Sequence, residues 1–179
     1  MAKVQLAFRD ELDGPGFKWA RPDQFHLTLK FLGDVAVESV PPLTAALRPA
    51  VAAVRGLQIV SRGVGCFPGL QRPRVVWFGL SDPAGQLPLL EEGVTQATAP
   101  FTAEAKKERF VGHITFCRIQ NFKHSHKQVL AGLCGRFAQT EFGAWQVREV
   151  LLMLSELSPQ GARHTILEQF SLSGTAGSP

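Results

Sequence analysis

The sequence contains few cysteines, and the three present follow no recognisable pattern. Cys66, Cys117 and Cys134 are odd in number and widely spaced, and no C-x-x-C pair occurs among them. This spacing excludes a disulfide framework and a zinc site built from cysteines. We therefore predict that the three thiols are small hydrophobic side chains in a core.

Long apolar runs and blocks of basic residues are also absent. No apolar run reaches the roughly 20 residues of a membrane span, and the opening residues MAKVQLAFRDELDG turn acidic too early for a signal peptide. We expect a cytoplasmic protein without a membrane partner. The missing basic blocks exclude a purely electrostatic nucleic-acid clamp, although the net charge of +4 favours an anionic partner such as nucleic acid or a phosphorylated small molecule.

The hydrophobic pattern predicts an α+β fold with mostly antiparallel sheets. The 179 residues, 45% of them hydrophobic, suit one domain of two closely packed lobes without a linker, and we expect a monomer. Because each half offers a strand, a helix and a hairpin in that order, we predict a bilobal, duplicated unit whose two sheets face a central cleft with helices outside. Helices are predicted over 4–12, 38–56, 87–97 and 123–139, and strands over 25–32, 57–67, 73–80, 109–119, 145–157 and 163–172.

One predicted strand in each half carries a histidine and a threonine two residues apart. In DQFHLTLKFLG, alternation places His26, Thr28 and Lys30 on one face, and in FVGHITF it does the same for His113 and Thr115. A half-buried strand with a solvated polar face gives the same alternation, so one such motif alone is not specific. Two motifs in matching positions point to a shared site.

Two facing imidazoles and two hydroxyls are suited to splitting a phosphate ester. A neutral imidazole accepts a proton from water while a protonated one donates to the leaving oxygen, and both forms coexist near pH 7. The hydroxyls of Thr28 and Thr115 can donate to nonbridging phosphate oxygens, and Lys30 can offset the anionic charge. The pattern therefore predicts hydrolysis without a metal.

Longer stretches around the two motifs carry a family resemblance. They are KWARPDQFHLTLKFLGDV, GVGCFPGLQRPRVVWFGL, RFVGHITFCRI and LLMLSELSPQGARHTILEQF. Together they resemble the 2H phosphoesterases, and among these the bacterial RNA 2',3'-cyclic phosphodiesterases, also known as 2'-5' RNA ligases. The resemblance implies opening of a 2',3'-cyclic phosphate to a 2'-phosphomonoester, on RNA ends or on nucleoside 2',3'-cyclic phosphates, with no metal or nucleotide cofactor. Relatives usually begin with a strand before the first helix, whereas this chain starts at or inside that helix, so we expect one sheet to lack a strand.

The resemblance also implies individual roles. His26 would be the general acid that protonates the departing 3' oxygen and His113 the base that activates water, while Thr28 and Thr115 would bind the phosphate. The symmetry of the two motifs does not by itself decide which histidine is the acid.

Further candidates for substrate contacts lie near the motifs. Arg109 precedes the second motif and Arg118 follows it, and both are candidate phosphate contacts, although strand alternation turns Arg118 away from His113 unless a bulge intervenes. Phe67 and Trp77 could stack on a nucleobase, or could belong to the core.

Two other readings of the sequence remain open. His124 and His126 form an H-x-H pair with Cys117 nearby in sequence, but its position between Lys123 and Lys127 fits a solvated helix start better than a zinc site, so no metal is predicted. The same four motif residues could instead grip an RNA end without catalysis. They could also run the reverse reaction, which joins a cyclic phosphate end to a 5'-hydroxyl.

Overall fold

In a computed structural model, which describes residues 1–103, 110–158 and 161–173, the chain passes back and forth between two units. None of the helices within these ranges is long and apolar enough to span a bilayer. The first unit consists of Met1–Thr28, Ile59–Ser81 and Val111–Trp145, and the second of Leu29–Gln58, Asp82–Phe110 and Gln146–Pro179.

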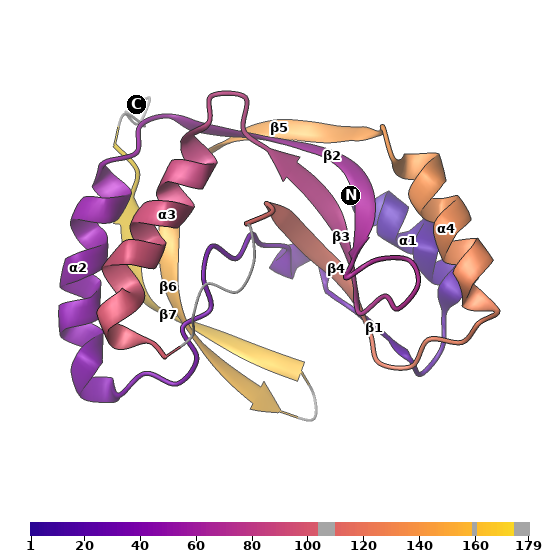
Figure 1. The fold of residues 1–179 in the computed structure, drawn as a ribbon, viewed down its shortest axis with the longest axis horizontal. Coiled ribbons are helices and arrows are strands. Elements are labelled where there is room, and N and C mark those ends of the chain that lie inside the picture. The colour runs from indigo at the N-terminus through magenta and orange to yellow at the C-terminus, as the bar shows by residue number, and fades with distance from the viewer. Residues whose placement is uncertain (104–109, 159–160, 174–179) are drawn as a thin grey trace. The chain divides into compact units, whose positions relative to one another are not determined.

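The first unit is built on a five-stranded sheet with the order β1-β4-β3-β2-β5. β4 pairs antiparallel with both β1 and β3, and β3 pairs antiparallel with β2. Helices α1 and α4 lie side by side and pack on the sheet (Figure 1). The elements are α1 (Ala2–Leu12), β1 (Phe17–Trp19), β2 (Leu57–Phe67), β3 (Val75–Ser81), β4 (His113–Ile119), α4 (His126–Phe137) and β5 (Glu141–Val147), with a 3-10 turn at Pro22–Gln24.

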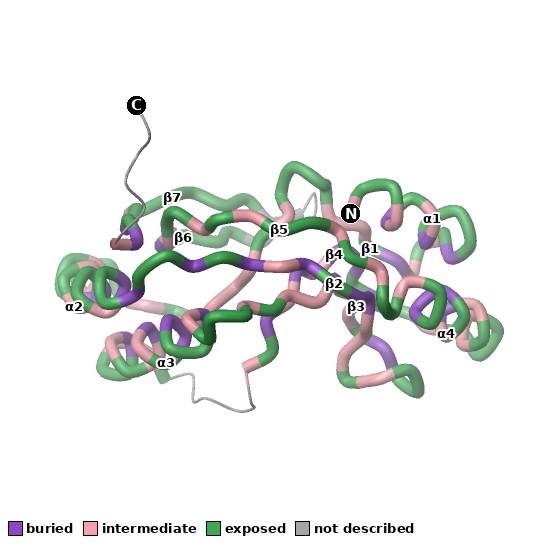
Figure 2. The backbone as a smooth tube through the Cα atoms, turned by 90° about the horizontal axis from the view of Figure 1, so that it is seen from above, coloured by how far each residue is buried: buried purple, intermediate pink, exposed green. Residues whose placement is uncertain are grey.

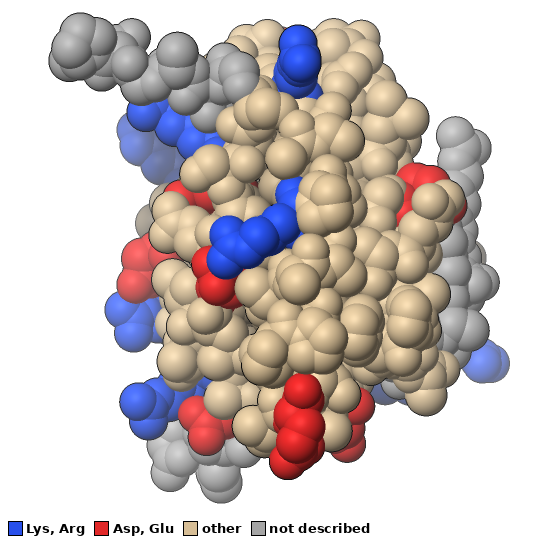
Figure 3. Space-filling model, turned by 90° about the vertical axis from the view of Figure 1, so that its left-hand side faces the viewer, with Lys and Arg blue, Asp and Glu red and all other residues tan. Residues whose placement is uncertain are grey.

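The second unit combines two helices with a two-stranded hairpin. Helix α2 (Val40–Ala52) packs on α3 (Gln86–Thr98) and on β7 (Gly161–Ser171), which pairs antiparallel with β6 (Glu149–Ser158). Short 3-10 turns occur at Val37–Ser39 and Ala99–Phe101. Among the described residues on the side of the molecule that carries α2, basic and acidic side chains are scattered and do not gather into a patch of one sign (Figure 3).

The core of the first unit lies between the sheet and its two helices. Phe78 of β3 and Phe116 of β4 are completely buried, with ring centroids 4.3 Å apart, and Phe8 of α1 meets Phe116 edge-on at 5.2 Å. Buried stretches of this unit lie within its strands and on the inner sides of α1 and α4 (Figure 2). Because alternate residues of a strand point to opposite faces, the other face of the sheet is left for different side chains.

The pairing of β3 with β4 contains one irregularity. Trp77 lies opposite Thr115, but Val76 lies opposite Cys117, so Phe116 is an extra residue on β4. Phe116 and Cys117 are both fully buried, although they are neighbours in sequence. This β-bulge shifts the alternation of β4 by one residue.

A buried glutamine of α1 contacts the extra residue of β4. The side-chain amide of Gln5 donates to the carbonyl oxygens of Phe116, at 3.0 Å, and Ala20, at 2.6 Å. The carbonyl oxygen of Phe116 also accepts a hydrogen bond from the main-chain N–H of Ala20 at 3.0 Å. Gln5 therefore links α1 to the extra residue of β4 and to the segment that follows β1.

The cysteines lie on the side of the sheet that α1 and α4 cover. Cys117 and Cys134 are buried as predicted, whereas Cys66 is only partly buried. Burial raises the pKa of the Cys117 thiol to about 12. Hydrogen bonding between Cys66 and Cys134 raises the pKa of Cys134, helped by burial, and lowers the pKa of Cys66. The thiols of Cys117 and Cys134 are thus protonated at neutral pH and unsuited to nucleophilic chemistry.

Much of the predicted arrangement is confirmed. The fold is α+β with antiparallel sheets, all four predicted helices form, and the strands predicted over 57–67 and 73–80 pair with each other.

Two strand predictions need correction, and one strand was not predicted. The strand expected over 25–32 is an extended segment with a single bridge at Leu27, because side-chain alternation alone does not supply a hydrogen-bonded partner along its length. The strand expected over 145–157 breaks at Arg148, where β5 ends and β6 begins in a different sheet. β1 was not predicted, since three residues are too few for a periodic pattern.

Candidate active site

The first motif joins the sheet through one antiparallel bridge. Leu27 pairs with Ile114 of β4, whose side chain is buried in the core. Residues next to a bridge point to the opposite face from the bridged pair. The histidine and threonine of both motifs therefore share the sheet face away from α1 and α4, which we call the polar face.

The antiparallel sense of this bridge aligns each histidine with the threonine of the other motif. His26 lies across from Thr115, and Thr28 across from His113. Side chains directly opposite in such a pair have Cβ atoms about 4.5–5.5 Å apart, and diagonal neighbours are about 7–8 Å apart. The two histidines are therefore diagonal neighbours on the same face of the sheet. Both motifs lie in the first unit, rather than one in each unit.

The two imidazoles are held by the same local contact. Nδ1 of His26 lies 2.7 Å from the carbonyl oxygen of Gln24, and Nδ1 of His113 lies 2.8 Å from that of Val111. A carbonyl oxygen only accepts, so each hydrogen bond requires the proton on Nδ1. In the neutral ring Nε2 is then the basic nitrogen. The repeated contact gives both rings the tautomer that exchanges protons through Nε2.

Aromatic rings form a wall beside His113. The ring of Phe67 meets His113 edge-on at 5.1 Å, and Trp77 lies 6.3 Å from it, while Phe67 and Trp77 are 4.9 Å apart. Both aromatic side chains are half-buried, so they neither belong fully to the core nor stand free in solvent. The wall restricts His113 to one side and offers an apolar surface next to it.

Gly65 makes room for this wall, and replacing it by alanine is expected to disrupt it. A Cβ at Gly65 would lie 2.4 Å from Cζ2 of Trp77, so the indole must move away from its place beside His113. Because small displacements near reacting groups can cost on the order of 10²-fold in rate, we expect kcat/KM for a cyclic phosphate substrate to fall about 10- to 100-fold. Steady-state kinetics and tryptophan fluorescence measure the two effects.

Gly69→Ala is the matched control, since a Cβ at Gly69 meets no atom within 4 Å. Equal activity of the two variants would show that the position of Trp77 does not matter to the site.

Arg118 faces the same way as the motif residues. It lies opposite Val75, which is two residues from Trp77 on β3, and Trp77 lies opposite Thr115. Val75, Trp77 and the residues paired with them therefore share one face of the sheet. Alternation alone predicted that Arg118 points away from His113 unless β4 contains a bulge, and β4 contains this bulge. The side chain of Arg118 is exposed.

Two other predicted contacts stand apart from this arrangement. Lys30 belongs to the second unit, and its part in the site remains a prediction. Arg109 lies outside the described residues, and its role likewise remains a prediction.

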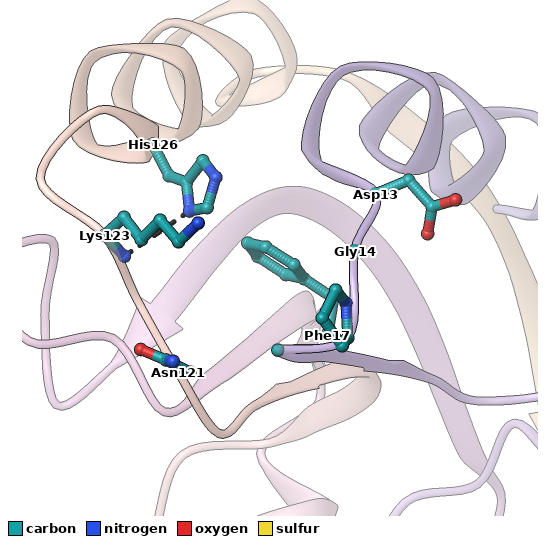
Figure 4. A pocket seen from close by; sticks show the side chains of 8 residues that line it. Asp13, Gly14, Phe17, Asn121, Lys123 and His126 are labelled. Carbon is teal, nitrogen blue, oxygen red and sulfur yellow. Dashed lines mark hydrogen bonds between the residues drawn. The ribbon is translucent and has the colours of Figure 1, made fainter.

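The H-x-H pair lies away from the two motifs, at the start of α4. His126 lines a pocket with Phe17, Asn121 and Lys123, between the turn after α1 and the start of α4 (Figure 4). Its Nδ1 accepts a hydrogen bond from the main-chain N–H of Lys123 at 3.4 Å, and its ring meets Phe17 at 5.2 Å. Within the described ranges no three His, Cys, Asp or Glu side chains come together as metal ligands would. His126 is engaged in packing at the start of the helix.

Comparison with known proteins places the chain in a family. The family model described as LigT like Phosphoesterase matches residues 1–77. A protein of Aquifex aeolicus named RNA 2',3'-cyclic phosphodiesterase is 33% identical over 162 residues, which cover 88% of this chain and 82% of the relative. One of the same name from Thermus thermophilus is 33% identical over 168 residues, covering 90% of this chain and 79% of the relative. The chain belongs to the LigT-like phosphoesterase family.

Solved structures agree with this assignment. A crystal structure of a Thermus thermophilus protein has a TM-score of 0.75 and 27% identity, covering 98% of this chain and 95% of that one. The structure of E. coli LigT complexed with 3'-AMP has a TM-score of 0.66 at 23% identity, covering 97% and 93%, and shares the fold. The family resemblance expected from the two motifs is thus confirmed.

Two residues of this LigT-like phosphoesterase lie near the motifs but were not predicted there from the sequence. Gly65 carries a recognisable signal, because a glycine inside a strand pattern indicates close approach of another group. Lys18 faces the same way as Arg118, its partner across the sheet. No sequence signal indicated this, since the strand that positions Lys18 is only three residues long.

Proposed function

We propose that the chain is a metal-independent RNA 2',3'-cyclic phosphodiesterase that hydrolyses 2',3'-cyclic phosphate ends to 2'-phosphomonoesters. The observation that carries the proposal is the antiparallel bridge between Leu27 and Ile114, which brings the two motifs together. The names of the relatives support the substrate class. The proposal includes RNA ends or nucleoside 2',3'-cyclic phosphates as substrates, a monomeric enzyme and a cytoplasmic location.

In the proposed reaction the two histidines act on opposite sides of the phosphorus, one as the base for water and the other as the acid for the leaving oxygen. Nε2 of His113 takes a proton from water, whose oxygen forms a bond to phosphorus. The bond from phosphorus to the 3' oxygen breaks, and protonated His26 gives its Nε2 proton to that oxygen. The products are a 2'-phosphate and a 3'-hydroxyl, after which proton exchange with solvent restores both rings. The family resemblance supports this choice of acid and base.

The threonines and cations hold the substrate in this scheme. The hydroxyls of Thr28 and Thr115 donate to nonbridging oxygens, each beside the histidine of the other motif. Holding the phosphorus between the two rings makes the attack effectively intramolecular. Arg118 and Phe67 contact the substrate from the polar face, and Lys30 and Arg109 are proposed as further phosphate contacts.

The proposal predicts a specific product in a metal-free reaction. We expect the purified chain to convert adenosine 2',3'-cyclic phosphate, and an oligonucleotide with the same end, to the 2'-phosphate, with no loss of rate in EDTA. Phosphorus NMR identifies the position of the phosphate. A 3'-phosphate product, or a rate that depends on added metal, would contradict the proposed chemistry. Tight binding without turnover would identify an RNA-end binding module instead.

A further inference from the structure

Two of the three cysteines contact each other, although they lie far apart in the sequence. The thiol of Cys66, on β2, and the thiol of Cys134, on α4, are joined by a hydrogen bond. Both are free thiols in this structure, and Cys134 is buried whereas Cys66 is only partly buried. The pair therefore has one sulfur that a small reagent in solvent can reach and one that is covered.

The register of β2 explains why Cys66 points toward α4. Cys66 lies opposite Val76 of β3, whose side chain is buried in the core under the helices. The next residue, Phe67, points the other way, because alternate residues face opposite sides of a sheet. Its ring centroid lies 5.1 Å from that of His113. Cys66 thus stands between the helix-covered core on one side of β2 and the aromatic wall on the other.

Joining the two sulfurs requires the removal of two hydrogen atoms, for which a hydroperoxide is a suitable oxidant. The thiolate of Cys66 attacks one oxygen of hydrogen peroxide, the O–O bond breaks, and the products are a sulfenic acid and, after protonation, water. The sulfur of Cys134 then attacks the sulfur of Cys66. The S–O bond breaks, and the hydroxyl group leaves as water with the thiol proton of Cys134. Two thiols and one hydrogen peroxide thus give one disulfide and two waters.

The contact between the two thiols favours both steps. Hydrogen bonding to Cys134 lowers the pKa of Cys66, which increases the fraction of reactive thiolate. The pKa of Cys134 is raised chiefly by its hydrogen bond to Cys66, so this effect ends once Cys66 is oxidised. The second step is also intramolecular, which offsets the weak nucleophilicity of a thiol. Cys117 differs, because it is fully buried and burial raises its pKa to about 12.

We propose that Cys66 and Cys134 form a reversible disulfide in the presence of a hydroperoxide, and that this bond lowers the activity of the site beside it. Disulfide-bonded sulfurs lie about 2.05 Å apart, closer than two sulfurs joined by a hydrogen bond, so β2 and α4 must approach each other. This movement displaces Phe67, which directly follows Cys66, from its place beside His113. The effect on activity rests on the proposed function, whereas the bond itself does not. Transient disulfides of this kind are compatible with a cytoplasmic protein.

Peroxide treatment followed by peptide mass spectrometry tests the bond. After a short incubation with a small excess of hydrogen peroxide, free thiols are alkylated in denaturant and the chain is digested without reductant. We expect a cross-linked pair of peptides that contain Cys66 and Cys134, an alkylated Cys117, and loss of the cross-link in dithiothreitol. Cross-links through Cys117, or a Cys66 that remains free or is oxidised without a cross-link, would refute the pair.

Two serine variants complete this experiment. Cys66→Ser should form no cross-link, because it lacks the sulfur that reacts first. Cys117→Ser is the matched control, since it also removes one thiol from the same unit, and it should form the cross-link as the wild type does. Circular dichroism establishes that both variants are folded. A cross-link to Cys134 that persists in Cys66→Ser would assign the reaction to a different thiol and overturn the inference.

Kinetics separate the effect of the bond from the proposed function. Peroxide should lower wild-type kcat/KM for adenosine 2',3'-cyclic phosphate by about 10- to 100-fold, since small displacements near reacting groups can cost on the order of 10²-fold. Dithiothreitol should restore the rate, and Cys66→Ser should keep its rate in peroxide. A cross-link that leaves the wild-type rate unchanged, or an equal loss in Cys66→Ser, would overturn the effect on the site. A cross-link in a protein that hydrolyses no cyclic phosphate would support the disulfide while refuting the phosphodiesterase.

Discussion

Replacing His113 or His26 by alanine is expected to lower kcat for a 2',3'-cyclic phosphate by about 10²- to 10⁴-fold, the contribution of one positioned acid or base. Each ring is held through Nδ1 by a main-chain carbonyl, which makes Nε2 the basic nitrogen of the neutral ring. Because one ring must be protonated and the other neutral, the wild-type rate should follow a bell-shaped pH profile. Each single variant should lose one limb of that profile.

His124→Ala is the matched control for this experiment, since His124 is an exposed histidine outside the polar face. Circular dichroism establishes that all three variants are folded. The double variant His26→Ala, His113→Ala should be little slower than the worse single variant, because groups that act in one transition state are not additive. Full activity in either single variant would eliminate the paired-histidine mechanism.

The motif residues could be predicted because their signal is local. The alternation of His26 and Thr28, repeated at His113 and Thr115, reports which side chains share a face, and this does not depend on the strand's partner. The strand predicted over 25–32 does not form, which shows that alternation reports the face of a side chain and not the pairing of the strand. One bridge at Leu27 is sufficient to align the motifs, although alternation over eight residues indicated a full ladder.

The direction of Arg118 could not be predicted from alternation alone. An extra residue in β4 brings Arg118 to the same face of the sheet as Thr115, and this extra residue is visible only in the pairing of β4 with β3. The break between β5 and β6 at Arg148 could not be predicted for a similar reason. β5 and β6 are both apolar strands, and only their pairing with different sheets separates them.

The largest expected effect on stability comes from Phe78→Ala. Phe78 is fully buried and contacts Phe116, Phe142 and Phe25, with ring centroids 4.3, 5.0 and 5.8 Å away. Truncating a buried phenylalanine removes its burial and leaves a cavity, so we expect the free energy of unfolding to fall by about 3–5 kcal/mol. Urea denaturation at 25 °C measures this change. Because domains of this size are stabilised by only about 5–15 kcal/mol, part of the population could unfold at moderate temperature.

Leu6→Ala is the comparison, since Leu6 is an apolar residue of the same unit that is 57% exposed, and its truncation should change stability by less than about 0.5 kcal/mol. A loss below about 1 kcal/mol in Phe78→Ala would place the core elsewhere. The loss also reaches the site, because Phe25 packs on Phe78 and directly precedes His26. At temperatures where Phe78→Ala is still folded, its kcat should therefore be lower than that of Leu6→Ala, since the segment that carries His26 has lost the ring on which it rests.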